Sequence, residues 1–257
     1  MLNKLNYFWR IIATGVCFSL FGLGGLLLSL FVFPIQRLII SDKKSQKRVA
    51  RKTVHYTFKF FIGFMGFVGI FKFNLQQAQQ LKSLNGHLIM ANHPSLIDVV
   101  VLISMIPNAD CIVKTHLFKN VFLKGVVNNT GYISNADPEG LLEDCESSLR
   151  EGNNLIIFPQ GTRTKLDDEL HFQRGAANIA IRCQANVTSV LLKVIPSTLT
   201  KNAPWYRIPK TKAHFSAMVV DHSPILPENN VIQTSKDVRQ YNRDLENFFR
   251  EELSKYG

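Results

Sequence analysis

The feature that most constrains the fold is an uncharged apolar run from Ile11 to Phe33. A run of this length can cross the hydrocarbon layer of a bilayer as one α-helix. Three aromatic residues at positions 7–9 precede it, as in the aromatic belts at membrane interfaces, and Pro34 is expected to end the helix. A cleaved signal peptide fits less well, because its apolar core is shorter and a small-residue cleavage site follows it. We therefore predict attachment to the cell membrane.

Basic residues gather directly after this run and give the chain much of its formal net charge of +11. The segment 43–52 holds Lys43, Lys44, Lys47, Arg48, Arg51 and Lys52, against only Lys4 and Arg10 before the run. The positive-inside rule places everything after about residue 42 in the cytoplasm. We interpret this segment as a solvated flank, with a specific lipid site as the alternative. Nucleic acid would explain the charge but not the apolar run, so no nucleic-acid partner is expected.

A second apolar patch extends from Phe58 to Phe73, with glycines at 63, 66 and 69. It is too short to span a bilayer upright, and we predict an interfacial helix beside the first one; a buried core helix is the alternative. A single span and a monotopic hairpin in one leaflet both remain open. We assign residues 1–75 to a membrane-anchoring segment and residues 76–257 to a second domain.

The remaining chain alternates between short apolar strands and helices. Strands are expected at 87–91, 111–113, 155–158, 190–195 and 214–220, and helices at 95–106, 137–152, 175–183 and 234–256. This order predicts an α/β fold with a mixed or parallel sheet flanked by helices. The four cysteines are far apart and read as reduced thiols. Neither they nor the histidines show metal-ligand spacing, so we expect no metal.

The first motif with chemical content is NHPSLID at 92–98, between a predicted strand and a predicted helix. Pro94 suits the first helical position, which places His93 at the exposed corner. If the first turn is irregular, Asp98 can reach one ring nitrogen of His93, fix its tautomer and leave the other nitrogen free as a base. A His and an Asp five residues apart are, by themselves, more often a surface coincidence.

The second motif is FPQGTRT at 158–164, which also follows a buried strand. Ligands of open α/β sheets bind beyond the carboxyl ends of the strands. Gly161 permits a tight turn, Thr162 offers a hydroxyl, and Arg163 offers a planar fork suited to phosphate. Taken alone, this loop would more often be a surface turn with a solvated arginine. The sequence has no G-x-S-x-G elbow, no P-loop and no G-x-G-x-x-G after a strand.

Together the two loops resemble the conserved blocks of the glycerolipid acyltransferase family, which includes lysophosphatidic acid acyltransferases. Weaker similarity covers Lys114 with Leu117-Phe118, the segment FQRGAA at 172–177 and Val194-Ile195-Pro196. The resemblance implies His93 as catalytic base, Asp98 as its partner, and Gly161 and Arg163 at the acceptor phosphate. We also assign Asn92, Lys114, Gln160 and Thr162 to substrate binding. Gln160 replaces the usual Glu of the family, and Asn135 lies where a charged pair is usual.

The resemblance implies an acyltransferase that moves a fatty acyl chain from acyl-CoA or acyl carrier protein to a hydroxyl of a lysophospholipid-type acceptor. The expected partners are a lipid membrane, the acyl donor and the lipid acceptor. No cofactor is expected besides the donor as co-substrate. Acylation of another lipid or of a polyketide-like precursor is one alternative, and an inactive membrane-bound lipid-binding module is another.

Overall fold

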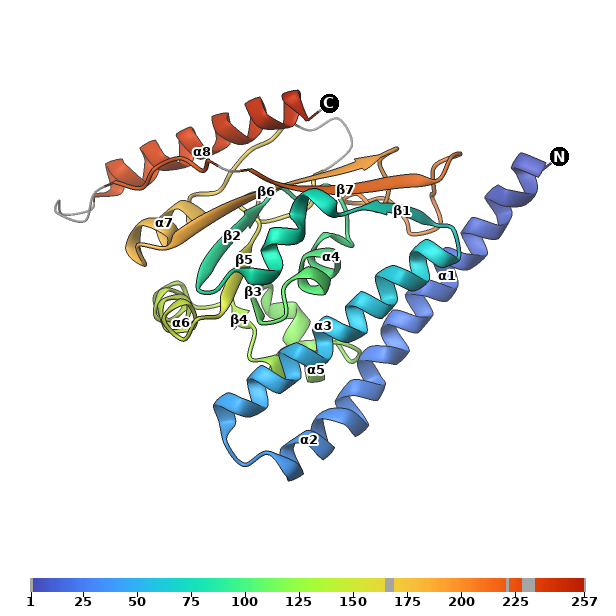
Figure 1. Ribbon diagram of the computed structural model, residues 1–257, viewed down its shortest axis with the longest axis horizontal. Coiled ribbons are helices and arrows are strands. Elements are labelled where there is room, and N and C mark those ends of the chain that lie inside the picture. The colour runs from blue at the N-terminus through green and yellow to red at the C-terminus, as the bar shows by residue number, and fades with distance from the viewer. Residues whose placement is uncertain (1, 165–168, 221, 228–233, 257) are drawn as a thin grey trace.

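The computed structural model describes residues 2–164, 169–220, 222–227 and 234–256. A central sheet has helices on both faces, and a long N-terminal helix runs past one side of it (Figure 1). The strands, in sheet order, are β1 (Phe71–Asn74), β7 (Ala213–Val220), β6 (Asn186–Ile195), β2 (His87–Ala91), β5 (Asn154–Ile157), β3 (Ala109–Val113) and β4 (Ile133–Ser134). Neighbouring strands are parallel except β6 and β7. The predicted fold class is confirmed.

Alternate residues of the central strand β2 serve two apolar cores. Ile89 and Ala91 belong to one core, together with residues of the N-terminal helices, and Leu88 and Met90 belong to the other. Both faces of a parallel sheet are covered by helices, so its strands read as continuous apolar runs. On one face lie α4 (Asp98–Met105) and α5 (Lys124–Thr130), and on the other lie α6 (Pro138–Arg150), α7 (Arg174–Arg182) and α8 (Ser235–Lys255).

The N-terminal apolar segment forms a longer helix than the sequence indicates. α1 (Leu2–Leu27) continues through a π-helical turn (Leu28–Val32) into α2 (Phe33–Ile39), so the prediction that Pro34 ends the helix was wrong. The N–H of Phe33 bonds to the carbonyl of Leu28, five residues back, and Pro34 then lies in the first turn of α2, where it needs no N–H partner. Residues Lys4–Ile39 are long and apolar enough to cross a membrane.

The second apolar patch is not one helix, which corrects the sequence interpretation. α3 (Lys43–Phe67) contains the basic segment and most of the Phe-rich patch, while the end of the patch forms β1 beside β7. Gly69, with φ of +84°, turns the chain between them. α3 packs on α1, with the ring of Phe21 5.8 Å from Phe58 and 5.5 Å from Phe61. The expected helical pair is therefore present, and the division at residue 75 stays a prediction.

Two buried arginines fasten this helical pair to the rest of the chain. Arg10 of α1 donates to the carbonyl oxygens of Pro209, Lys210 and Thr211, just before β7. Arg51 of α3 pairs with Asp110 of β3 at 2.7 Å, and both side chains are buried. A buried charge without its partner is strongly destabilising, so both contacts fix where the helices lie on the sheet.

Candidate active site

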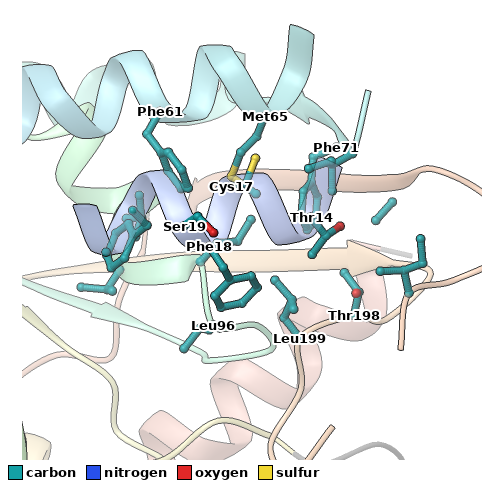
Figure 2. A pocket seen from close by; sticks show the side chains of 18 of the residues that line it. Thr14, Cys17, Phe18, Ser19, Phe61, Met65, Phe71, Leu96, Thr198 and Leu199 are labelled. Atoms are coloured by element: carbon teal, nitrogen blue, oxygen red, sulfur yellow. The ribbon is translucent and has the colours of Figure 1, made fainter. Parts of the chain in front are cut away.

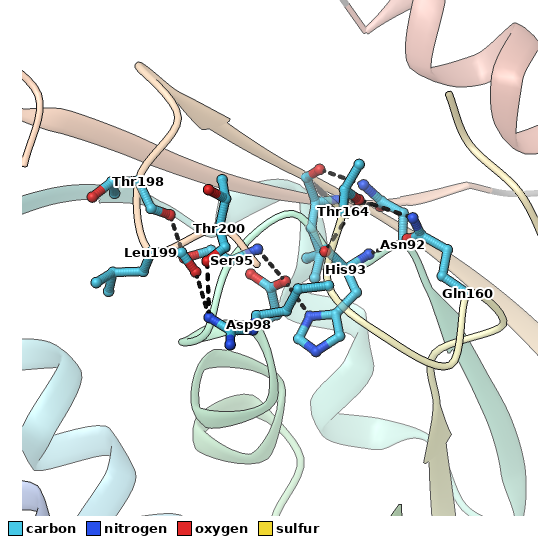
Figure 3. Close-up of polar contacts among 11 residues, drawn as sticks. Asn92, His93, Ser95, Asp98, Gln160, Thr164, Thr198, Leu199 and Thr200 are labelled. Atoms are coloured by element: carbon cyan, nitrogen blue, oxygen red, sulfur yellow. Dashed lines mark hydrogen bonds and ion pairs between the residues drawn. The ribbon is translucent and has the colours of Figure 1, made fainter. Parts of the chain in front are cut away.

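The two motifs meet because their strands are parallel neighbours. β2 lies between β5 and β6 and is parallel to both, so the segments that follow these three strands leave the same edge of the sheet. They are the 92–98 loop, the 158–164 loop and the 196–200 segment. Figure 3 shows their side chains joined by one hydrogen-bond network.

His93 and Asp98 form the pair that the sequence predicted. The distance from His93 Nδ1 to Asp98 Oδ2 is 2.7 Å. α4 begins only at Asp98, so the expected helix start at Pro94 is not found; a bend at Ser95 and a turn at Leu96 and Ile97 precede it. This turn brings the carboxylate back to the ring, and the Ser95 N–H also donates to Asp98 Oδ2 at 2.8 Å. His93 Nε2 is left for chemistry on a bound molecule.

Asp98 is fully buried, which governs its electrostatics. Burial raises the pKa of the Asp98 carboxyl, while the hydrogen bond and charge of His93, the Ser95 N–H and the charge of Arg163 act in the opposite direction. Asp98 Oδ1 has no hydrogen-bond partner among the described residues. A buried carboxylate beside an imidazole stabilises the imidazolium that forms when the ring takes a proton.

Gln160 supports His93 from the neighbouring loop. Its Oε1 accepts a hydrogen bond from the His93 backbone N–H at 2.7 Å, and its Nε2 donates to Thr164 Oγ1 at 2.8 Å. Thr164 also donates its own N–H to the His93 carbonyl at 2.8 Å. The His93 ring stacks on Phe158 with centroids 4.2 Å apart. The amide of Gln160 thus holds the loops together, and its contact with an acceptor stays a prediction.

Arg163 is held by the third segment. Its Nη1 donates to the carbonyls of Leu199 and Thr200 at 2.9 and 3.1 Å. Leu199, buried and with φ of +55°, also accepts from the Leu96 N–H at 3.1 Å. A non-glycine residue with this backbone conformation persists only where its surroundings enforce it. The sequence resemblance includes residues 194–196 at the end of β6, but it does not indicate that these carbonyls bind Arg163. No side-chain pattern marks a backbone acceptor.

The other predicted binding residues lie at different depths. Asn92 is buried and pairs its amide with both backbone groups of Leu192, at 2.8 and 2.7 Å. Lys114 is exposed at the carboxyl end of β3, on the same edge of the sheet. Gly161 takes φ of +66°, which glycine adopts without strain, and Thr162 is partly exposed beside it. Substrate contacts of these residues stay predictions.

A large apolar cavity adjoins this network. Its volume is about 730 Å³, and α1, α3, the 96–100 segment and the 198–199 segment form its walls. Figure 2 shows Cys17 and Phe18 of α1 opposite Leu96 and Leu199. Leu96 and Leu199 bond to each other through their backbones, so the segment that carries His93 and Asp98 also supplies one wall. The sequence gave no signal for this cavity, because its walls come from distant segments.

Comparison with known proteins identifies the domain that carries these loops. Residues 72–193 match the family model described as Acyltransferase. The match covers both loops and just under half of the chain. The resemblance read from the two loops is confirmed.

Relatives of this chain are named as enzymes of one reaction. The chain is 35% identical over 112 residues to a 1-acyl-sn-glycerol-3-phosphate acyltransferase of Helicobacter pylori, covering 41% of this chain and 47% of that protein. A protein of the same name from Cocos nucifera is 27% identical over 143 residues, covering 51% and 46%. The chain thus spans about half the length of these relatives.

The fold is shared with a solved structure over almost its whole length. The crystal structure of the 1-acyl-sn-glycerophosphate (LPA) acyltransferase PlsC from Thermotoga maritima superposes with a TM-score of 0.63 and covers 97% of both chains. The sequence identity is 16%, so this likeness concerns the fold alone. It includes the N-terminal helical pair, which lies outside the family match.

The role of Gln160 can be tested by replacing it with Leu and, as a matched control, with Glu. Gln160→Leu leaves the His93 N–H without a partner and should destabilise the fold by about 1–3 kcal/mol. Gln160→Glu can still accept from His93 and can receive the Thr164 hydroxyl, so it should stay close to wild type. Thermal unfolding in neutral detergent measures both. Equal losses for the two variants would contradict the hydrogen-bonding role.

Proposed function

We propose that this chain is an O-acyltransferase that moves a fatty acyl chain from a thioester donor to a hydroxyl of a 1-acylglycerol-3-phosphate-like acceptor. The observation that carries the proposal is the His93–Asp98 pair beside the apolar cavity. A base at 2.7 Å from a buried carboxylate suits deprotonation of a hydroxyl, and a cavity of about 730 Å³ suits an acyl chain.

The reaction proceeds by direct attack. His93 Nε2 takes the proton of the acceptor hydroxyl while its oxygen bonds to the thioester carbonyl carbon. The tetrahedral adduct then releases the thiolate by cleavage of the carbon–sulfur bond, and the imidazolium returns the proton to sulfur. Asp98 holds the ring in the tautomer that accepts at Nε2 and stabilises its charged form. The chain's residues supply no covalent intermediate in this scheme, and no metal or cofactor is invoked.

The acceptor and donor follow from charge and from the names of the relatives. Arg163 carries a positive charge near Asp98, and Lys114 stands on the same edge of the sheet, which suits an anionic acceptor such as a phosphate monoester. The relatives are named for 1-acyl-sn-glycerol-3-phosphate as the acceptor. Acyl-CoA and acyl carrier protein both fit as donors. The intact His93–Asp98 pair favours an enzyme over an inactive lipid-binding module.

We also propose that the helical pair attaches the protein to the cell membrane with the catalytic domain on the cytoplasmic face. Only 22% of the most apolar window of the N-terminal helix is buried by the rest of the chain. Leu5, Phe8, Ile12, Leu23, Leu27, Leu30 and Phe31 of this helix are among the exposed apolar residues. One face of α1 packs on the domain and the other faces outward, which favours a helix pair lying in one leaflet.

The catalytic assignment predicts a steep loss of turnover. His93→Ala should lower the rate of acyl transfer by about 10²–10⁴-fold, the usual contribution of a positioned general base. Asp98→Asn should also lower it strongly, because the amide permits the wrong tautomer. Single-turnover transfer from an acyl thioester to 1-acylglycerol-3-phosphate measures both, with circular dichroism as the check on folding. A folded His93→Ala protein of near-normal rate would refute the assignment.

The cavity assignment predicts a change in chain-length preference. Gly22 of α1 lines the cavity, and we expect Gly22→Leu to fill part of it and shift the preference toward shorter acyl chains. Gly24→Leu is the matched control, because a Cβ at Gly24 meets nothing within 4 Å. Competition between acyl donors of different length measures the shift. The same preference in both variants and wild type would exclude this cavity as the acyl site.

Membrane attachment through apolar burial predicts resistance to salt. The wild-type chain should stay in the membrane pellet in high salt and in alkaline carbonate, since apolar burial is not screened by ions. Replacing the exposed Leu27, Leu30 and Phe31 with Ser should release a large fraction of the protein from the membrane. Replacing the exposed Ile225, which lies outside the helical pair, with Ser should leave the protein in the pellet. Release of wild type by salt alone would show that basic residues alone attach it.

A further inference from the structure

A basic groove lies beside β4, the outermost strand on one side of the sheet. It is separate from the site of His93, which lies beyond the carboxyl ends of β2, β5 and β6. It consists of two adjoining hollows of about 660 and 360 Å³ that share Lys47 and Asn128. The start of α3 forms one side, and α5, β4 and α6 form the other. In Figure 1 this start of α3 follows the turn after α2, at the far end of the helical pair. The groove includes most of the basic segment 43–52. For this segment the sequence left two interpretations open, a solvated flank and a specific lipid site.

The charges of the groove do not cancel. Lys44 pairs with Glu151 at 2.9 Å, and Arg51 pairs with Asp110 at 2.7 Å. The remaining charged residues of the two hollows are four cations and one carboxylate, none with an ion-pair partner within the described part of the chain: Arg37, Lys43, Lys47, Arg48 and Asp144. The groove therefore presents excess positive charge, which attracts an anion.

The walls of the groove also offer neutral hydrogen-bonding groups. Asn128, Ser134 and Ser147 line it. Hydroxyls and amides beside cations are the groups that bind phosphate oxygens and glycerol-like hydroxyls. This composition is typical of a site that binds a polar headgroup and is less typical of a solvated run of charges.

Apolar side chains stand directly beside this groove. Ile35, Leu38 and Ile39 of α2 are 55%, 86% and 77% exposed, while Gln36 and Arg37 of the same helix line the smaller hollow. An acidic water-soluble protein would leave this apolar tip uncovered, whereas a lipid covers both parts at once. We propose that the groove binds the phosphodiester headgroup of an anionic phospholipid, with the lipid's acyl chains against α2.

The proposal uses the membrane attachment proposed above but not the acyl-transfer activity. It is tested on the full chain in neutral detergent micelles, where attachment to a bilayer plays no part. The probe is dioctanoylphosphatidylglycerol, and the comparison ligands are dioctanoylphosphatidylcholine and inorganic phosphate. The variant is Lys47→Gln with Arg48→Gln, and the matched control is Lys236→Gln with Arg239→Gln on α8, which removes the same two charges from another face.

We expect saturable binding of phosphatidylglycerol by calorimetry, weaker binding of phosphatidylcholine, and no displacement by phosphate at similar concentration. Removing Lys47 and Arg48 should raise the Kd for phosphatidylglycerol by about tenfold or more, and the control variant should keep the wild-type Kd. Equal Kd values for both lipids, or for the groove variant and wild type, would refute the site. Displacement by phosphate would identify a free-phosphate site instead. Unchanged lipid binding with lost binding of an acidic carrier protein would assign the groove to that protein.

Discussion

The parallel pairing of β2 with both β5 and β6 is the constraint on which the rest of the structure depends. It makes three distant segments leave the sheet at one edge, so that His93, Gln160 and Leu199 become neighbours. Each segment then stabilises another: Gln160 holds the backbone of His93, and Leu199 holds both Leu96 and Arg163. None of these loops has its geometry by itself, which is why either motif alone carries little information.

The burial of Asp98 determines the electrostatics of the site. A carboxylate excluded from water interacts strongly with the few charges near it, here the ring of His93 and the guanidinium of Arg163. Arg163 is fixed by two backbone carbonyls and so adds a positive charge near the pair without moving. The site is preorganised, in that its donors and acceptors are oriented before any substrate arrives.

The sequence predicted the parts of the molecule that depend on local pattern. The strand at 87–91 has the predicted bounds, and the His93–Asp98 pair is formed as expected. The sequence did not predict β4, which has two residues and exists only through its pairing with β3. It also placed β1 inside an apolar helix, because Phe71 and Phe73 continue the Phe-rich pattern. The partners of Arg10 and Arg51 lie far along the chain, and no local pattern indicates them. The cavity was missed for the same reason.

The cavity wall that α1 shares with the α/β domain couples two properties that are usually independent. Residues of α1 that line the cavity stand in the same stretch of sequence as residues that face outward, and Phe18 and Leu23 do both. Under the proposed function, this stretch contacts the membrane on one side and the acyl chain on the other. Under the same proposal, a substitution that adapts the helix to a thicker or thinner membrane would also change which acyl chain the product carries. By the same geometry, exchanging the N-terminal segment for that of a relative would change the acyl-chain preference together with the membrane attachment.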